Sequence, residues 1–76
     1  MSAAQQIDFS LRGDHITLDA LLKATGIASS GGIAKMMIAD GQVRVDGVKE
    51  LRKTCKIRAE RLVEVAGARI RVLAAP

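Results

Sequence analysis

The side chains with the greatest capacity for chemistry in this chain are cations gathered in one short stretch. Seven bases lie within eighteen residues, against three acids: Arg44, Lys49, Arg52, Lys53, Lys56, Arg58 and Arg61. The chain has a formal net charge of +4, and residues 44–76 carry nine bases against four acids. Clustered Lys and Arg suit contacts with phosphates. The same pattern is also typical of a solvated strand face with mixed charges.

Other reactive side chains are few and isolated. His15 is the only histidine, in a predicted loop, and Cys55 is the only cysteine, on the predicted apolar side of a strand. Acid–base catalysis requires a group positioned against its substrate, and metal binding requires several ligands together. We therefore expect no enzyme activity, no metal site, no cofactor and no small-molecule substrate.

Length and composition limit the kinds of protein that this chain can be. Seventy-six residues, 49% of them hydrophobic, can form one domain with a small core. A single cysteine permits no internal disulfide, which fits the cytoplasm. No apolar run is long enough for a membrane span, and the first residues, MSAAQQIDFSL, do not resemble a secretion signal. We expect one domain over residues 1–76, with frayed ends at 1–5 and 74–76.

Aromatic residues are nearly absent, which limits how nucleic acid could be bound. Phe9 is the only one, with no Trp and no Tyr. Many single-strand binders stack bases on aromatic side chains. A nucleic acid would therefore be held here through phosphates, groove shape and arginine planes.

The first half of the chain predicts a strand and a helix. Ile7, Phe9 and Leu11 alternate with polar residues, as in a half-buried strand. Thr17 is a candidate N-cap for a helix that ends at Gly26. The leucines within that helix recur at the spacing of one helical face: Leu18, Leu21 and Leu22.

A second helix is predicted up to Gly41, with Ser29 or Ser30 as its cap. Its expected apolar stripe consists of Ile33, Met37 and Ile38. Two glycines in its first turn each cost about 0.5–1 kcal/mol relative to Ala. Gly31 and Gly32 could allow close approach of the first helix or of a ligand backbone, or could reflect local looseness.

The remaining chain predicts strands. Val43 and Val45 point inward from a strand at 42–45, Arg44 points outward, and Asp46-Gly47 forms a tight turn. Residues 48–62 have the pattern of an extended segment with two faces, except that Lys53 falls on the wrong side, which indicates a twist or bulge there. One face would then carry Leu51, Cys55 and Ile57, and the other Arg52, Thr54, Lys56 and Arg58. A final hairpin is expected around Gly67-Ala68, with a type II′ turn.

Two short helices followed by AKMMIADGQVRVDG resemble the RNA-binding domain named after small-subunit ribosomal protein four. That domain also occurs in pseudouridine synthases, tyrosyl-tRNA synthetase and a ribosome-rescuing heat-shock protein. The family pattern A-(R/K)-x-x-I-x-x-G, then x-V-x-V-(N/D)-G, is matched by Ala34, Lys35, Ile38, Gly41, Val43, Val45, Asp46 and Gly47. The family's R-L-D-x-x-L opening is matched by Leu18, Asp19 and Leu22. The resemblance covers about residues 16–66. Through the segment RKTCKI it extends to small stand-alone bacterial members.

The resemblance implies an α+β fold, the alpha-L motif, with two short packed helices against a small, mostly antiparallel sheet. It also implies a non-catalytic module that binds structured RNA, ribosomal or otherwise folded, as part of a ribosome or ribonucleoprotein. Two customary cations are missing, because Thr17 and Gly31 occupy their positions. We expect the binding role to shift toward residues 49–58.

The predicted RNA-binding residues come from two sources. Lys35 and Arg44 follow from the family motif. The charge pattern and the stand-alone members supply Lys49, Arg52, Lys53, Lys56 and Arg58. Two alternatives stay open: a DNA-binding helix-turn-helix, and an adaptor whose basic strand docks an acidic protein.

Overall fold

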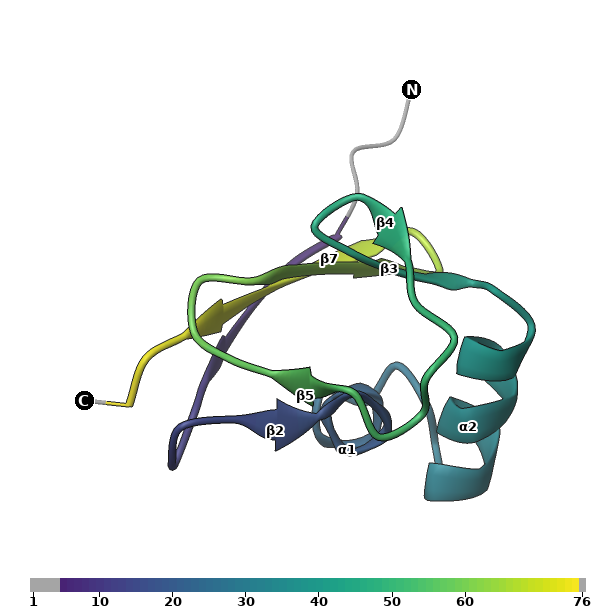
Figure 1. The fold of residues 1–76 in the computed structure, drawn as a ribbon, viewed down its shortest axis with the longest axis horizontal. Coiled ribbons are helices and arrows are strands. Elements are labelled where there is room, and N and C mark those ends of the chain that lie inside the picture. Colours follow the sequence, from purple (N-terminus) through teal and green to yellow (C-terminus); the bar gives the residue numbers. More distant parts are fainter. Residues whose placement is uncertain (1–4, 76) are drawn as a thin grey trace.

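The computed structural model describes residues 5–75. The elements follow in the order β1 (Gln5–Ser10), β2 (Ile16–Thr17), α1 (Leu18–Ala24), α2 (Gly31–Ala39), β3 (Val43–Val45), β4 (Val48–Lys49), β5 (Lys56–Ile57), β6 (Leu62–Val65) and β7 (Ala68–Leu73). Two helices and a mostly antiparallel sheet confirm the expected α+β fold (Figure 1). Of the expected frayed ends, residues 1–4 and 76 lie outside the described residues, and Gln5 already pairs with Ala68.

Two sheets organise the strands. The larger has the order β1-β7-β6-β3-β4, and the smaller pairs β2 with β5. Every pairing is antiparallel except that of β1 with β7. In Figure 1 the larger sheet lies above α1 and the β2–β5 pair, while α2 stands at one side.

The core fills the space between the larger sheet and the helices. Leu18, Leu21 and Leu22 of α1 are fully buried, as their spacing predicted. They join one cluster with alternating residues of the sheet, among them Val43, Val63, Ile70 and Val72. Removing these side chains from water is the main stabilising contribution to a domain of this size.

The core-facing side of α2 differs from the expected stripe. Ala34 and Ile38 are fully buried, whereas Ile33 is 43% exposed. The expectation was therefore wrong at Ile33 and right at Ile38, while Met37 packs at the edge of the core. The small side chain of Ala34 gives the reason, because it lets α2 pack closely on its neighbours.

The start of α2 resolves the roles of its serine and glycines. Ser30 is the cap, and its Oγ accepts a hydrogen bond from Ile33 N at 3.2 Å. A Cβ added to Gly31 would meet nothing within 4 Å, and one on Gly32 would meet only Ser30 Oγ at 3.9 Å. Close approach of the first helix to these glycines is therefore not their explanation.

The start of α1 is capped by a distant segment. Thr17 occupies the N-cap position but makes no side-chain cap hydrogen bond. Instead, Leu18 N donates to the carbonyl of Cys55 at 2.9 Å, and Asp19 N donates to that of Lys53 at 3.1 Å. These two bonds satisfy N–H groups that a helix start leaves without intrahelical partners.

Residues 48–62 are not extended throughout, and the departure from an extended chain includes a turn at Lys53, where the pattern indicated a twist or bulge. Only Val48–Lys49 and Lys56–Ile57 are strands, and residues 50–55 form a loop between them, named here the basic loop. Leu51 is 56% exposed, so the prediction of an inward face shared with Ile57 is wrong at that position. The reason is that carbonyls of the basic loop pair with α1 rather than with a strand.

Both tight turns have the same geometry. Asp46 and Gly47 have φ values of 52° and 83°, and Ala66 and Gly67 have 51° and 76°. Two successive positive φ values are characteristic of a type I′ turn. The first turn is as predicted, but the second lies one residue earlier than expected and is not type II′. Pairing of Val65 with Ala68, both buried, sets that register.

Ala66 has a φ of 51°, in the left-handed region that Ala rarely adopts and that Asn tolerates better. Ala66→Asn creates the Asn-Gly pair favoured in type I′ turns and should stabilise the domain by about 0.5–1 kcal/mol. Thermal unfolding should show a midpoint higher by roughly 2–8 °C. Ala24→Asn, within α1, should give no such rise. A lower midpoint for Ala66→Asn would contradict this account of the turn.

Asp46 joins the first turn to the start of β6. Its carboxylate accepts hydrogen bonds from Arg61 Nη1 at 2.6 Å and from Leu62 N at 3.0 Å, and its own N–H donates to Leu62 O. The Leu62 N–H, followed by Arg61, holds the pKa of Asp46 below the usual 3.8. The ionised form therefore stabilises the folded state.

Asp46→Asn should test this contribution through its pH dependence. A lowered folded-state pKa gives stability that is present above pH 3.8 and is lost as the pH falls below it. Because the carboxylate is partly exposed, we expect the wild type to exceed the variant by at most about 1 kcal/mol near pH 6. Unfolding midpoints measured at falling pH should converge below about pH 4. A constant difference down to the most acidic pH would refute the assignment.

Candidate nucleic-acid interface

Cations from separate segments meet around one open concavity of about 870 Å³. Its lining consists of Lys35, Arg52, Lys53, Thr54, Cys55 and Lys56. Lys35 comes from α2, and the others come from the basic loop and β5. The fold thus brings four of the seven predicted site residues to one place.

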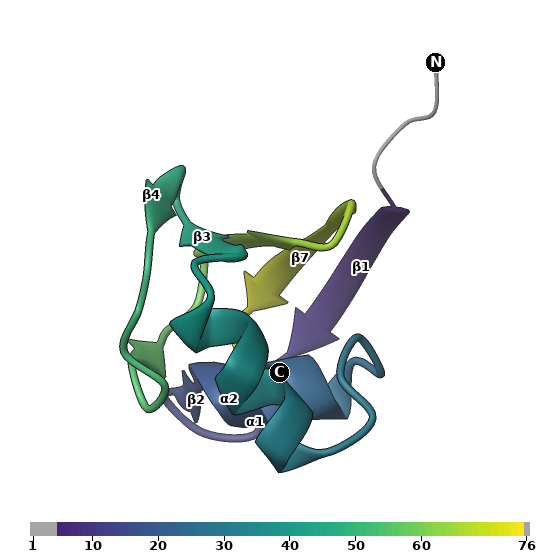
Figure 2. The ribbon, with the colours of Figure 1, turned by 90° about the vertical axis from the view of Figure 1, so that its right-hand side faces the viewer.

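The positions of these side chains follow from burial and pairing. Burial of Ala34 leaves the adjacent Lys35 on the exposed side of α2. Ile57 is 1% exposed, so strand alternation directs the neighbouring Lys56 outward. The backbone of Lys56 pairs with that of Thr17 in β2. Figure 2 shows α2 at the front with the basic loop beside it.

Three lysines supply uncompensated charge to the concavity. Lys35, Lys53 and Lys56 are exposed, and among the described residues no acidic side chain lines the concavity with them. Within residues 5–75, none of the three lies within 4.0 Å of a carboxylate. Lysine ammonium groups on flexible stems act as point charges toward phosphates. The concavity is therefore suited to an anionic chain.

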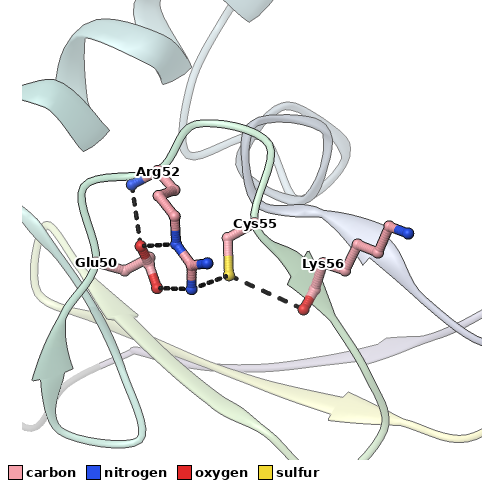
Figure 3. A network of polar contacts seen from close by, with 4 residues as sticks. All are labelled: Glu50, Arg52, Cys55 and Lys56. Atoms are coloured by element: carbon pink, nitrogen blue, oxygen red, sulfur yellow. Dashed lines mark hydrogen bonds and ion pairs between the residues drawn. The ribbon is translucent and has the colours of Figure 1, made fainter.

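Arg52 differs from the lysines because it is held by an acid. Its Nε donates to Glu50 Oε2 at 3.0 Å and its Nη2 donates to Oε1 at 3.2 Å (Figure 3). Hydrogen bonds from the Arg52 side chain, and then from its N–H, lower the pKa of Glu50 to about 2. Glu50 is therefore ionised at neutral pH, and Arg52 meets the concavity as one half of an ion pair.

Arg44 and Lys49 do not line the concavity. They face each other across β3 and β4, and Arg44 also lies opposite Glu64 of β6. The Lys49 stem runs beside Gly41, where an added Cβ would lie 3.2 Å from Lys49 Cδ. These two predicted site residues form a separate pair on the larger sheet.

Arg58 is likewise absent from the concavity lining. Its Nη1 lies 3.4 Å from Asp14 Oδ2. A hydrogen bond donated by His15, at 2.8 Å, is the main cause that lowers the pKa of Asp14.

His15 lies in the loop before β2, as the sequence predicted.

Two residues were missed as contributors to this surface. Thr54 lines the concavity with a hydroxyl group, and its alternation with Lys56 was the available signal. Glu50 fixes the position of Arg52 through hydrogen bonds. The mixed charges around Glu50 in the sequence are equally typical of an acid that only faces solvent. The carboxylate of Glu50 accepts from the N–H two residues later, and the sequence does not show whether the loop adopts the shape that this local bond requires.

Cys55 has the properties of a structural thiol. Partial burial is the main cause that raises its pKa, followed by a hydrogen bond with Glu50. The protonated thiol is a weak nucleophile. Within the described range 5–75, no three His, Cys, Asp or Glu side chains gather as metal ligands. Neither helix of that range has the length and apolar character needed to cross a membrane.

Comparison with known proteins places this geometry in a family. The S4 domain matches residues 9–73. YbcJ of Escherichia coli (strain K12), whose name marks it as a candidate RNA-binding protein, is 49% identical over 67 residues. The uncharacterized YbcJ of Shigella flexneri is equally identical. Each match covers 87% of this chain and 96% of the relative.

A solved structure agrees with the sequence relatives. The solution structure of E. coli YbcJ is described as revealing an αL motif involved in RNA binding. It is 47% identical to this chain, with a TM-score of 0.69, and the match covers 97% of this chain and 92% of YbcJ. The expected family resemblance is confirmed by the matched domain and by the shared fold: this chain belongs to the S4 domain family.

Proposed function

We propose that this protein is a non-catalytic module that binds structured RNA in the concavity between α2 and the basic loop. The observation that carries the proposal is the convergence of Lys35, Lys53 and Lys56 on that concavity without a carboxylate partner among residues 5–75. Membership of the S4 domain family and the RNA-binding descriptions of YbcJ support it.

The binding mechanism is electrostatic. Lysines that neutralise RNA phosphates release condensed counterions, which supplies affinity without reading sequence. With Phe9 as the only aromatic residue, selectivity comes from RNA shape and 2′-hydroxyl contacts rather than from base stacking. The Thr54 hydroxyl can donate or accept a hydrogen bond at a ribose or phosphate.

The cellular setting that fits this mechanism is the cytoplasm, on ribosomal RNA or another folded RNA within a ribonucleoprotein. A free Cys55 thiol is stable in such a reducing compartment. An acidic protein could occupy the same cations, and a DNA helix-turn-helix would use α2. Lys35 is the only cation of α2, so the helix itself offers little for a DNA groove.

Salt dependence of binding tests the mechanism. A labelled RNA stem-loop should bind more tightly than a DNA duplex of equal length and charge. The logarithm of the binding constant should fall with the logarithm of salt concentration at a slope of about −2 to −4, corresponding to roughly three or four phosphates. Equal, weak binding of both nucleic acids would overturn the proposal and favour an acidic protein partner.

Charge reversal tests the location of the site. Lys35→Glu with Lys53→Glu should weaken RNA binding at least roughly tenfold and reduce the magnitude of the salt slope by about 2. Lys23→Glu with Arg12→Glu changes net charge equally at exposed positions outside the concavity, and should have a much smaller effect. Equal losses for the two double variants would show that only net charge matters.

A further inference from the structure

Glu50 is an acid among the cations of the basic loop, and its side chain is largely buried. It is the only acid among residues 49–58. Its side chain is 17% exposed, whereas that of its partner Arg52 is 76% exposed. An acid that served only to keep the segment soluble would be expected to face water. Glu50 instead lies largely beneath the arginine that reaches the concavity.

Three hydrogen bonds fix Arg52 relative to Glu50. The carboxylate accepts from Arg52 N at 3.0 Å, from Nε at 3.0 Å and from Nη2 at 3.2 Å. One carboxylate thus fixes both the backbone and the planar guanidinium of the same residue. Figure 3 shows the guanidinium between the Glu50 carboxylate and the Cys55 sulfur, with the Lys56 ammonium directed away from them.

The opposite side of the guanidinium stays available. Arginine has five N–H donors in a rigid fork, and Glu50 uses the edge formed by Nε and Nη2. A weaker contact joins Nη2 to Cys55 Sγ at 3.8 Å. Within residues 5–75, the side-chain hydrogen bonds of Arg52 use Nε and Nη2, and Nη1 has no partner. Arg52 lines the concavity and also a neighbouring hollow of about 330 Å³, which Glu50, Cys55 and Lys56 line with it. Its Nη1 group can therefore donate to a phosphate at this surface while Glu50 holds the other edge.

Backbone hydrogen bonds fix the position of Glu50, so that its carboxylate can hold the Arg52 guanidinium in place. Its N–H donates to the carbonyl of Val43 at 3.0 Å, which ties Glu50 to a fully buried residue of the core. Cys55 N donates to the carbonyl of Arg52 at 3.3 Å and closes the loop beyond it. The guanidinium is therefore connected to the core through Glu50 rather than through its own flexible stem alone.

We propose that Glu50 is a positioning residue for RNA binding, which holds the Arg52 guanidinium with its Nη1 group open to an RNA phosphate. The inference rests on the proposed function and adds the role of an acid to a site otherwise defined by cations. An arginine fixed in this way loses less side-chain freedom when RNA binds.

Removing the charge of Glu50 should change RNA affinity in opposite directions, depending on whether net charge or positioning of Arg52 dominates. Glu50→Gln adds one unit of positive charge to the surface, so simple electrostatics predicts tighter RNA binding. The loss of the carboxylate also releases Arg52 from its bidentate contact with Glu50. If Glu50 positions Arg52 for a phosphate, the variant should bind RNA more weakly. The two explanations therefore differ in the direction of the change.

The experiment measures binding of a labelled RNA stem-loop to the full chain and its variants at one salt concentration. Glu50→Gln should weaken binding about threefold to tenfold. Glu64→Gln is the matched control, because Glu64 also pairs with an arginine, Arg69, but does not line the concavity. The control should bind equally or slightly more tightly. Equal or tighter binding by Glu50→Gln would overturn the proposal.

A double-mutant cycle separates positioning from general damage to the loop. In an Arg52→Gln background, Glu50→Gln should no longer weaken binding, because its effect acts through Arg52. Equal weakening in both backgrounds would show a purely structural role and would overturn the proposal. Circular dichroism and thermal unfolding verify that each variant is folded.

Arg52→Lys gives a test that does not depend on replacing Glu50. It keeps the charge but cannot form the bidentate contact, so it should weaken binding to a similar extent. Unchanged binding by this variant would also overturn the proposal. Wild-type protein that fails to bind the RNA stem-loop would instead refute the proposed function itself.

Discussion

The surface of this protein depends on two backbone hydrogen bonds that join the start of α1 to the basic loop. Leu18 and Asp19 donate to the carbonyls of Cys55 and Lys53, so a segment without strand pairing acquires a fixed position. The antiparallel pairing of β2 with β5 continues the same contact. The helix start obtains partners for its free N–H groups, and the loop obtains a rigid support. The concavity between α2 and this loop is the result.

A second feature is the different use of arginine and lysine. Among residues 5–75, the ion pairs formed by arginine and lysine side chains with Asp or Glu involve only Arg52, Arg58, Arg61, Arg69 and Arg71. The lysines around the concavity have no such partner in that range. Guanidinium groups suit fixed, planar contacts with carboxylates, whereas ammonium groups remain hydrated point charges. Arginines thus organise strands and loops, and lysines provide the free positive charge.

The start of α2 shows how this chain departs from its family's pattern. Ser30 provides the cap, and the following glycines leave open space where the family commonly carries a base. The cations that converge on the concavity come mostly from the basic loop and β5 instead. The unpaired lysines of the concavity therefore lie mostly on a segment whose position is fixed by its bonds to α1.

Local patterns in the sequence determined the helices, the first turn and the outward direction of the cations. Leucine spacing, the Ser30 cap, Gly26 and Asp46-Gly47 each act within a few residues, so their effects can be read without knowing the fold. Periodicity could not choose between Ile33 and Ala34 as the core-facing residue, because packing between elements decided it. Only the tertiary structure separated Arg44 and Lys49 from the concavity and showed that Glu50 holds Arg52. Arg44 and Lys49 lie on strands of the larger sheet, away from α2. Glu50 and Arg52 are only two residues apart, but their contact requires a loop shape that is set by the bonds of Glu50 N to Val43 O and of Asp19 N to Lys53 O.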